Sequence, residues 1–162
     1  MSGAPSPGPV TAEAGAIELL ARVLYAEAGA CPARAIEALA AVVLNRAAAA
    51  RSCPVAAARY ASGSQPASLA RAVIAVVRAP FQFPVRHPRH PQHARFMCPP
   101  ESDPALALCR RVAQRALAGA LPDATAGARL WHDARRLPAW AIGRVPHASL
   151  GGLCFYGEDA GG

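Results

Sequence analysis

Lysine is missing from this sequence: its 17 basic residues are all arginine, and they outnumber the 10 acidic ones to give a formal net charge of +7. Such an excess favours a polyanionic partner, namely nucleic acid, anionic lipid or an acidic wall polymer. The alternative interpretation is a GC-rich coding bias that replaces lysine by arginine. Aromatic residues amount to only 6% of the chain, and they are not interleaved with arginines as in a nucleic-acid platform. We therefore expect no nucleic-acid partner.

Long hydrophobic runs are missing too. No apolar run approaches the ~20 residues that a membrane span needs, so we expect no transmembrane segment. The opening MSGAPSPGPV has neither a basic start nor an apolar core and shows no secretory signal peptide, which leaves the localisation unknown. At 162 residues the chain has the size of one domain. We expect a disordered segment over residues 1–10, a single, monomeric domain over 11–158 and a tail over 159–162.

Several catalytic and metal-binding motifs are also absent. There is no GxSxG of a serine hydrolase and no glycine loop that would cradle a phosphate. The five cysteines include no CxxC pair, so neither a zinc ribbon nor a thioredoxin-like site is indicated. We interpret the cysteines as small apolar fillers, with a disulfide as the alternative. They are Cys31, Cys53, Cys98, Cys109 and Cys154.

Hydrophobic residues recur at helical spacing in four segments, most of them bounded by capping residues, glycine or proline. The expected helices run from Thr11 to Gly29, from Pro32 to near Asn45–Arg46, from Ser68 to before Pro80, and from Asp103 to Gly119. Residues 80–104 form a long, proline-rich connection. Two extended stretches, Arg129–His132 and Leu153–Tyr156, predict short strands. Helices first and strands last predict an α+β fold.

Glu27 does not fit the pattern of an ordinary amphipathic helix. It follows Leu24 by three residues and Val23 by four, so it continues the apolar stripe. A carboxylate facing a core is costly unless it is paired or used. Burial and the negative end of the helix dipole both raise its pKa, as a general acid working near neutral pH requires. The alternative is a last-turn glutamate that reaches solvent or pairs with an arginine.

Three histidines lie between prolines, three residues apart. In a polyproline II conformation His87, His90 and His93 would line one face about 9 Å apart. Ligands of one zinc ion sit ~2 Å from the metal, so this spacing suits no shared ion unless the loop folds back. We interpret the run as a solvated basic loop and expect no metal or other cofactor. Trp131–His132 and Trp140 fit either a hydrophobic core or a group of sugar-binding side chains.

Residues 19–46, LLARVLYAEAGACPARAIEALAAVVLNR, resemble the signature of the SleB-type cell wall hydrolase family, named for spore-cortex-lytic enzymes. The likeness extends from about residue 17 to 156. Where many members carry a second glutamate, this chain reads AGACP over residues 28–32. The shorter matches, in the same order as in the family, are Phe81–Phe83, Cys109–Gly119, Gly127–Ala128, Trp131–His132, Pro138–Ala141 and Phe155–Tyr156.

The resemblance implies a mainly helical, lysozyme-like domain with a small antiparallel sheet beside the cleft. It also implies that Glu27, in the AEA triplet, is the catalytic glutamate. Such enzymes cleave the MurNAc–GlcNAc bond of peptidoglycan by lytic transglycosylation, in which the 6-hydroxyl of the muramic acid attacks its own anomeric carbon and one carboxyl group suffices. The matching positions that we expect to bind substrate are Asn45, Gln82, Phe83, His132, Trp140 and Tyr156.

Three functions stay open at this point, and all three have peptidoglycan glycan strands as the partner. The first is the glycan-cleaving lytic transglycosylase. The second is an N-acetylmuramoyl-L-alanine amidase, which would usually need zinc. The third is a weakly active wall-binding module. In each case we expect Arg46, Arg86 and Arg89 to help hold anionic peptide stems or wall polymer.

Overall fold

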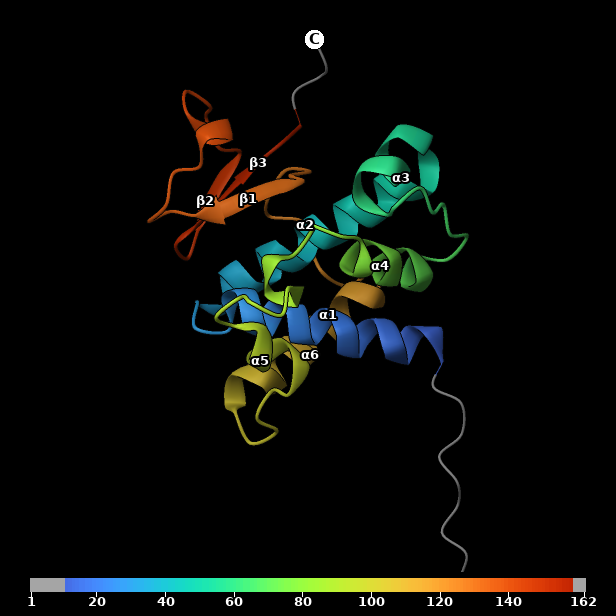
Figure 1. Ribbon diagram of the computed structural model, residues 1–162, viewed down its shortest axis with the longest axis vertical. Coiled ribbons are helices and arrows are strands. Elements are labelled where there is room, and N and C mark those ends of the chain that lie inside the picture. Colours follow the sequence, from blue (N-terminus) through green and yellow to red (C-terminus); the bar gives the residue numbers. More distant parts are fainter. Residues whose placement is uncertain (1–10, 159–162) are drawn as a thin grey trace, which may run out of the picture.

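Figure 1 shows a helical body with a small sheet at one end. The computed structural model describes residues 11–158, so the expected disordered segment and tail lie outside the described residues. The α-helices are α1 (Ala12–Ala28), α2 (Ala33–Ser52), α3 (Pro54–Tyr60), α4 (Leu69–Arg78), α5 (His93–Met97) and α6 (Pro104–Leu117). The other elements are the 3-10 turns η1 (Pro84–Arg86) and η2 (Ala139–Ala141) and the strands β1 (Leu130–Asp133), β2 (Ala148–Leu150) and β3 (Leu153–Tyr156). The α+β fold is confirmed. Between residues 11 and 158, no helix has the length and apolar character needed to cross a membrane.

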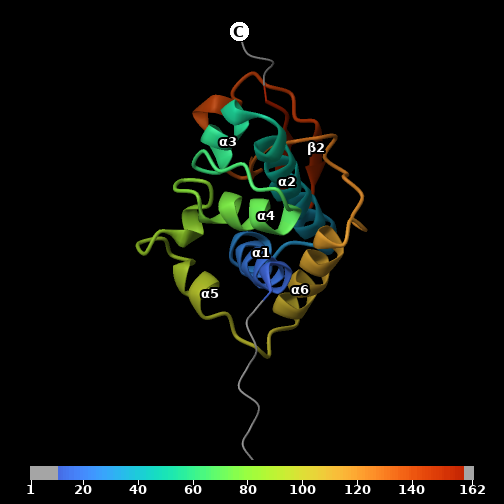
Figure 2. The same cartoon turned by 90° about the vertical axis from the view of Figure 1, so that its right-hand side faces the viewer.

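Helix α1 lies at the centre of the helical body, with α2, α4, α5 and α6 around it (Figure 2). Its predicted start is confirmed: the hydroxyl of Thr11 accepts a hydrogen bond from the backbone N–H of Ala14 at 3.1 Å, which satisfies one free donor of the first turn. Leu20 and Leu24 are fully buried, so the apolar stripe faces the core. Because its neighbours surround α1, they also fix the position of Glu27 near its C-terminal end.

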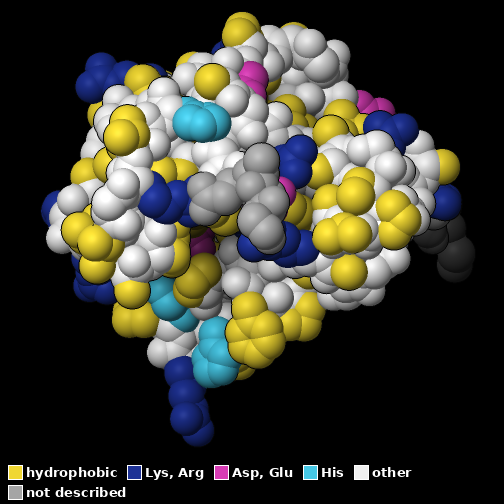
Figure 3. Space-filling model, turned by 90° about the horizontal axis from the view of Figure 1, so that it is seen from above, with side chains coloured by type: hydrophobic (Ala, Val, Ile, Leu, Met, Phe, Trp, Pro, Cys, Tyr) yellow, Lys and Arg dark blue, Asp and Glu magenta, His cyan; other side chains and the backbone are white. Residues whose placement is uncertain are grey.

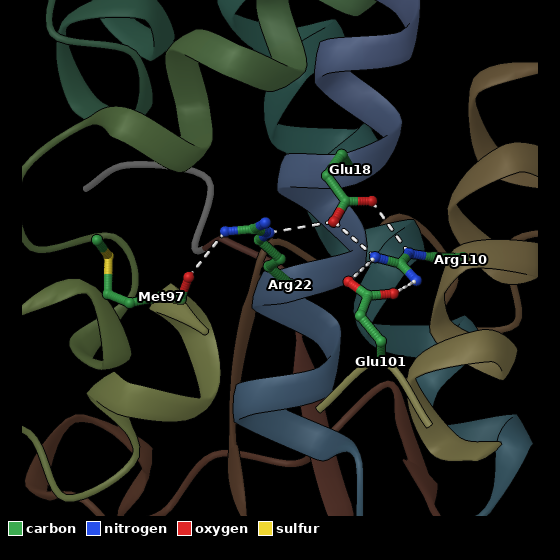
Figure 4. Close-up of polar contacts among 5 residues, drawn as sticks. All are labelled: Glu18, Arg22, Met97, Glu101 and Arg110. Carbon is green, nitrogen blue, oxygen red and sulfur yellow. Dashed lines mark hydrogen bonds and ion pairs between the residues drawn. The ribbon is translucent and has the colours of Figure 1, made fainter. Parts of the chain in front are cut away.

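Arginine–carboxylate contacts join α1 to α6 and to the segment before α6 (Figure 4). The guanidinium of Arg110 donates to Glu18 on α1 at 2.9 Å and to Glu101 at 2.6 Å. Arg22 donates to Glu18 at 3.1 Å and to the carbonyl of Met97 at 2.9 Å. Partly exposed pairs of this kind typically contribute below ~1 kcal/mol each. Their effect is geometric: Arg110 holds α6 and the segment before it against α1, and the bond from Arg22 to Met97 holds the end of α5 there.

Helix α2 extends further than the sequence pattern predicted. Asn45–Arg46 were expected near its end, but the helix continues through the alanines at 47–50 to Ser52, because alanine has the highest helix propensity. It stops at Cys53, and Pro54 begins α3, which was not predicted. Asn45 and Arg46 therefore lie in the body of α2, where their side chains reach across to the sheet.

The segment that carries the three histidines does not adopt the polyproline II conformation considered above. The segment folds back in successive turns, in which the N–H of His90 bonds to the carbonyl of His87 at 2.9 Å and the N–H of His93 to that of His90 at 3.0 Å. Nδ1 of His87 also accepts the backbone N–H of Arg89, and Nδ1 of His90 that of Gln92, each at 3.1 Å. These side-chain contacts favour turns over an extended chain.

The sheet is antiparallel throughout, in the order β1-β3-β2. Strand β3 matches the prediction, β1 begins one residue later than predicted, and β2 was not predicted. Gly151 and Gly152 join β2 to β3 with φ of 58° and 90°, which favours glycine at both positions. A Cβ on Gly151 would lie 2.7 Å from the Cβ of Ala35. This close approach packs the sheet against the start of α2.

The cysteines only partly follow the prediction. All five are free. Cys109 is buried in α6 and fits the interpretation as a core filler, whereas Cys53 and Cys98 are exposed. For these two the interpretation is wrong, because each lies at a helix end directly before a proline, where the chain turns at the surface.

Candidate active site

A cleft of about 1030 Å³ opens at the C-terminal end of α1. One wall comes from the sheet and the loop after β1, and the other from the segment between Phe81 and Arg95. In Figure 1 these walls are the orange and red sheet and the green and yellow segment that carries η1 and α5. The polar and aromatic side chains of the lining include Glu27, Arg46, Gln82, Arg95, His132 and Trp140.

Glu27 is half-buried in this lining, and its Oε1 is fully buried without a hydrogen-bond partner among residues 11–158. Burial is the largest influence on its carboxyl group and raises the pKa to about 7. A backbone hydrogen bond at Val85 and the positive charge of Arg46 act in the opposite direction but do not outweigh burial. At neutral pH both protonation states of Glu27 are therefore populated. A group of this kind can donate a proton and take one back.

Arg46 is a buried cation that connects three parts of the site, and only 6% of its surface is exposed. Its Nε donates to the carbonyl of Arg129 at 2.7 Å, and its Nη1 donates to Oε1 of Gln82 at 3.3 Å. The guanidinium lies 5.3 Å from the ring centre of Tyr60 and 5.6 Å from that of Phe83. Burial lowers its pKa to about 10, so it stays charged at neutral pH. Arg46 thus holds the strand side and the Gln82 side together.

Three aromatic side chains contact one another on the sheet side of the cleft, and two of them, His132 and Trp140, line it. The carbonyl of Asp133 lies 2.7 Å from Nδ1 of His132, and since a carbonyl only accepts, Nδ1 carries the proton. Nε2 of a neutral His132 then accepts from the hydroxyl of Tyr156 at 2.9 Å. The ring of Trp140 meets His132 and Tyr156 edge-on at 5.7 and 5.2 Å. Trp140 lines the cleft with 42% of its surface exposed.

The structure brings together only some of the residues expected to bind substrate. Gln82, His132 and Trp140 line the cleft with Glu27, and Tyr156 supports His132 from behind. Asn45 instead donates to the carboxylate of Asp123 at 3.0 Å and to the carbonyl of Ala128 at 2.9 Å, which fixes the loop before β1. Direct substrate contact is therefore the wrong interpretation for Asn45.

Phe83 needs the same correction. Only 3% of its surface is exposed, and it packs in the core beneath Arg46. Neighbouring side chains of the Phe-Gln-Phe stretch have different surroundings. Gln82 is in the cleft lining, where its Oε1 accepts from Arg46 and its Nε2 donates to the carbonyl of Arg59 at 3.0 Å. Phe83 lies in the core, and Phe81 has 99% of its surface exposed.

The sequence pattern did not single out two charged residues of the lining. Arg95 on α5 places its guanidinium 4.3 Å from the ring centre of Tyr25. Asp133 ends β1, and both its carboxylate oxygens accept from Arg135, at 3.1 Å from Nε and 2.7 Å from Nη2. This pairing holds the pKa of Asp133 at about 2. Neither residue stands on an apolar stripe, so periodicity offered no signal for them.

The described part of the chain contains no group of three or more His, Cys, Asp or Glu side chains arranged to hold a metal ion. His87, His90 and His93 do not converge, because the turns direct Nδ1 of the first two back to their own backbone. His93 instead bonds to the carbonyl of Val85 at 2.8 Å.

Phe81 combines full exposure with a φ of 64°, a left-handed backbone conformation that is costly for a side chain with a Cβ. We expect Phe81→Gly to be more stable than Phe81→Ala by about 1 kcal/mol, because only glycine relieves this strain. Both variants lose the ring, so urea unfolding of the pair isolates the backbone effect. Equal stability of the two variants would contradict the left-handed conformation.

Comparison with known proteins bears on the fold of the chain. No family model and no curated protein matches the chain. Among solved structures, it is similar to the catalytic domain of the SleB protein from Bacillus cereus, with a TM-score of 0.60 and 20% sequence identity. The match covers 96% of this chain and 99% of that chain. The fold is thus that of a SleB-type catalytic domain, which confirms for the fold the resemblance drawn from the sequence.

Proposed function

We propose that this protein is a cell wall hydrolase that cleaves peptidoglycan strands at the MurNAc–GlcNAc bond by lytic transglycosylation, with Glu27 as catalytic acid and base. The observation that carries the proposal is the position of Glu27 in the lining of a large cleft, where burial raises the pKa of its carboxyl group to about 7. The shared fold with the SleB catalytic domain and the match of the AEA triplet support the same substrate class.

In the proposed reaction protonated Glu27 donates its proton to the glycosidic oxygen as the bond to C1 of the muramic acid breaks. The glycan fragment leaves as an alcohol, and positive charge develops at C1. The 6-hydroxyl of the same muramic acid then forms the new C–O bond to C1 and returns its proton to the Glu27 carboxylate. The product is a 1,6-anhydro sugar, water is not consumed, and the acid is regenerated.

A glycosidase that uses water normally needs a second carboxylate near the bond. Asp133 lines the same cleft, but its two oxygens are occupied by Arg135 and its pKa of about 2 keeps it unprotonated. A carboxylate with both oxygens paired is a poor base for activating water. This contact favours the internal 6-hydroxyl over water as the nucleophile.

Digestion of purified sacculi in water enriched in ¹⁸O tests the proposal in one experiment. Lytic transglycosylation is expected to release muropeptides that end in 1,6-anhydro-muramic acid and carry no ¹⁸O from the solvent, as measured by mass spectrometry. A reducing-end muramic acid with one ¹⁸O would mean that water is the nucleophile. The isotope in the lactyl carboxylate would indicate an amidase, and binding without any cleavage would indicate a wall-binding module.

A further inference from the structure

A second groove, of about 750 Å³, lies next to the active-site cleft on the outer side of the segment between Arg78 and Pro91. Its apolar surface comes from Phe81 and from the prolines at positions 80, 84, 88 and 91. Its charged side chains are Arg78, Arg86 and Arg89, and no acidic residue of the described chain lines it. In the space-filling view, histidine and arginine side chains gather with hydrophobic ones at the lower edge of the molecule (Figure 3).

Within the part of the chain that the structure describes, no carboxylate pairs with the arginines of this groove. Among the ion pairs of residues 11–158, none involves Arg78, Arg86 or Arg89. Arg86 donates through Nη1 to the carbonyl of Val77 at 3.1 Å, while its Nε is buried without a partner in the described chain. Burial and the nearby charge of Arg78 lower the pKa of Arg86. An anion in the groove would stabilise the charged guanidinium of Arg86 and so offset the cost of its burial and the repulsion from Arg78.

The groove is continuous with the cleft that holds Glu27. Phe81, Pro84, His90 and Pro91 line both cavities. Phe81 stands between them, fully exposed and in its strained conformation. Strain of this kind persists where the surrounding structure enforces it and often marks a binding surface. A branched ligand could therefore occupy the two cavities at once.

We propose that this groove binds the peptide stem of the same peptidoglycan strand whose sugars occupy the cleft. This inference rests on the proposed function. A stem is a short peptide that bears several carboxylates and small aliphatic side chains. The arginines match the carboxylates, and the proline and phenylalanine rings match the aliphatic groups. The branch point between glycan and peptide would lie at Phe81. Arg46, which was expected to share this role, is instead buried and tied to Arg129 and Gln82.

Direct binding of a synthetic stem peptide, acyl-L-alanyl-γ-D-glutamyl-diaminopimelate, tests the inference without any need for cleavage. The test variant is Arg78→Gln/Arg89→Gln, which leaves the bonded Arg86 in place. The matched control is Arg71→Gln/Arg111→Gln, two exposed arginines outside both cavities whose loss gives the same change in net charge. We expect the test variant to bind about tenfold more weakly, as the loss of charge-assisted contacts implies, and the control to bind as the wild type does. Titration calorimetry gives the constants.

The peptide with all carboxylates converted to amides is expected not to bind. The inference is overturned if the free peptide does not bind to the wild type, if the test variant and the control bind equally, or if the amide form binds as well as the acid.

Cleavage assays keep this result separate from the proposed function. On glycan strands stripped of stems the test variant should match the wild type, and on stem-bearing strands its KM should rise. If the protein binds the stem peptide but cleaves neither substrate, the groove remains a stem-binding site and lytic transglycosylation is refuted.

Discussion

Glu27→Gln is expected to abolish cleavage of peptidoglycan while the protein stays folded. Glutamine has the size and shape of glutamate, so its contacts at the end of α1 change little. It can neither donate a proton to the leaving oxygen nor accept one from the 6-hydroxyl, so both halves of the proposed reaction fail. General acid–base assistance is typically worth 10²–10⁴-fold, and Asp133 is held unprotonated by Arg135. Initial rates of muropeptide release measure the loss.

The same variant should gain stability at alkaline pH. The folded pKa of Glu27 is about 7, against an ordinary value of 4.5, so between these two pH values the folded state binds more protons than the unfolded state. The free energy of unfolding of the wild type therefore falls as pH rises through this window, by about 3 kcal/mol at most. Above pH ~7 glutamine avoids this burial of charge. Urea unfolding at pH 4, below both pKa values, and at pH 8, above both, should show the gain only at pH 8.

Asp133→Asn is the matched control, since it neutralises the other acid identified in the cleft lining. Under lytic transglycosylation it should affect the rate far less than Glu27→Gln does. If Asp133→Asn is equally damaging in a folded protein, two carboxylates act and water becomes the nucleophile. A folded Glu27→Gln variant that keeps more than about a tenth of the activity would remove Glu27 from the mechanism.

Local signals predicted much of the helical body. The capping oxygens of Thr11, Ser68 and Asp103 each accept a backbone N–H within their own first turn, at 3.1, 3.2 and 2.9 Å. Such contacts involve residues two or three positions apart, which is why the pattern along the chain reveals them. Strand β2, with three residues, and helix α3, with seven, were not predicted. Elements this short carry too few residues to show a periodicity.

The site was predictable only where one helix defines it. Glu27 is conspicuous because its own neighbours on α1 place it on a buried face. Arg46 and Gln82 lie 36 positions apart, and Arg46 and Arg129 lie 83 positions apart, yet these groups are in contact. Nothing in the local sequence encodes such pairs. The family resemblance named Gln82 and His132, which line the cleft, together with Asn45 and Phe83, which hold the loop before β1 and the core.

The rate of cleavage by the wild type is expected to fall as pH rises above about 7. Glu27 must be protonated to donate to the leaving oxygen, and its pKa is about 7. Well above that pH the protonated fraction falls tenfold for each pH unit, so kcat/KM at pH 9 should be about a hundredfold lower than its plateau. The alkaline limb of the profile reports the pKa of Glu27 in the free enzyme.

Arg46→Met should move the alkaline limb of the kcat/KM profile to higher pH. The positive charge of Arg46 is one of the two influences that lower the pKa of Glu27. Replacing Arg46 with an apolar side chain of similar length should therefore raise the pKa of Glu27 further. The variant should also lose about 2–4 kcal/mol of stability, because the carbonyl of Arg129 and the amide of Gln82 lose their charged partner. Thermal unfolding at each pH is therefore recorded alongside kcat/KM.

Arg95→Met is the control for this shift, because it removes the same charge from the lining of the same cleft. Arg95 is not among the groups that shift the pKa of Glu27, and its guanidinium lies against the ring of Tyr25. Its profile should keep the alkaline limb of the wild type even if its KM changes. Two outcomes would mean that Glu27 is not the group that titrates. The first is a shift of the alkaline limb in the Arg95→Met variant, and the second is an unchanged limb in a folded Arg46→Met protein. The acid would then have to be sought elsewhere in the cleft.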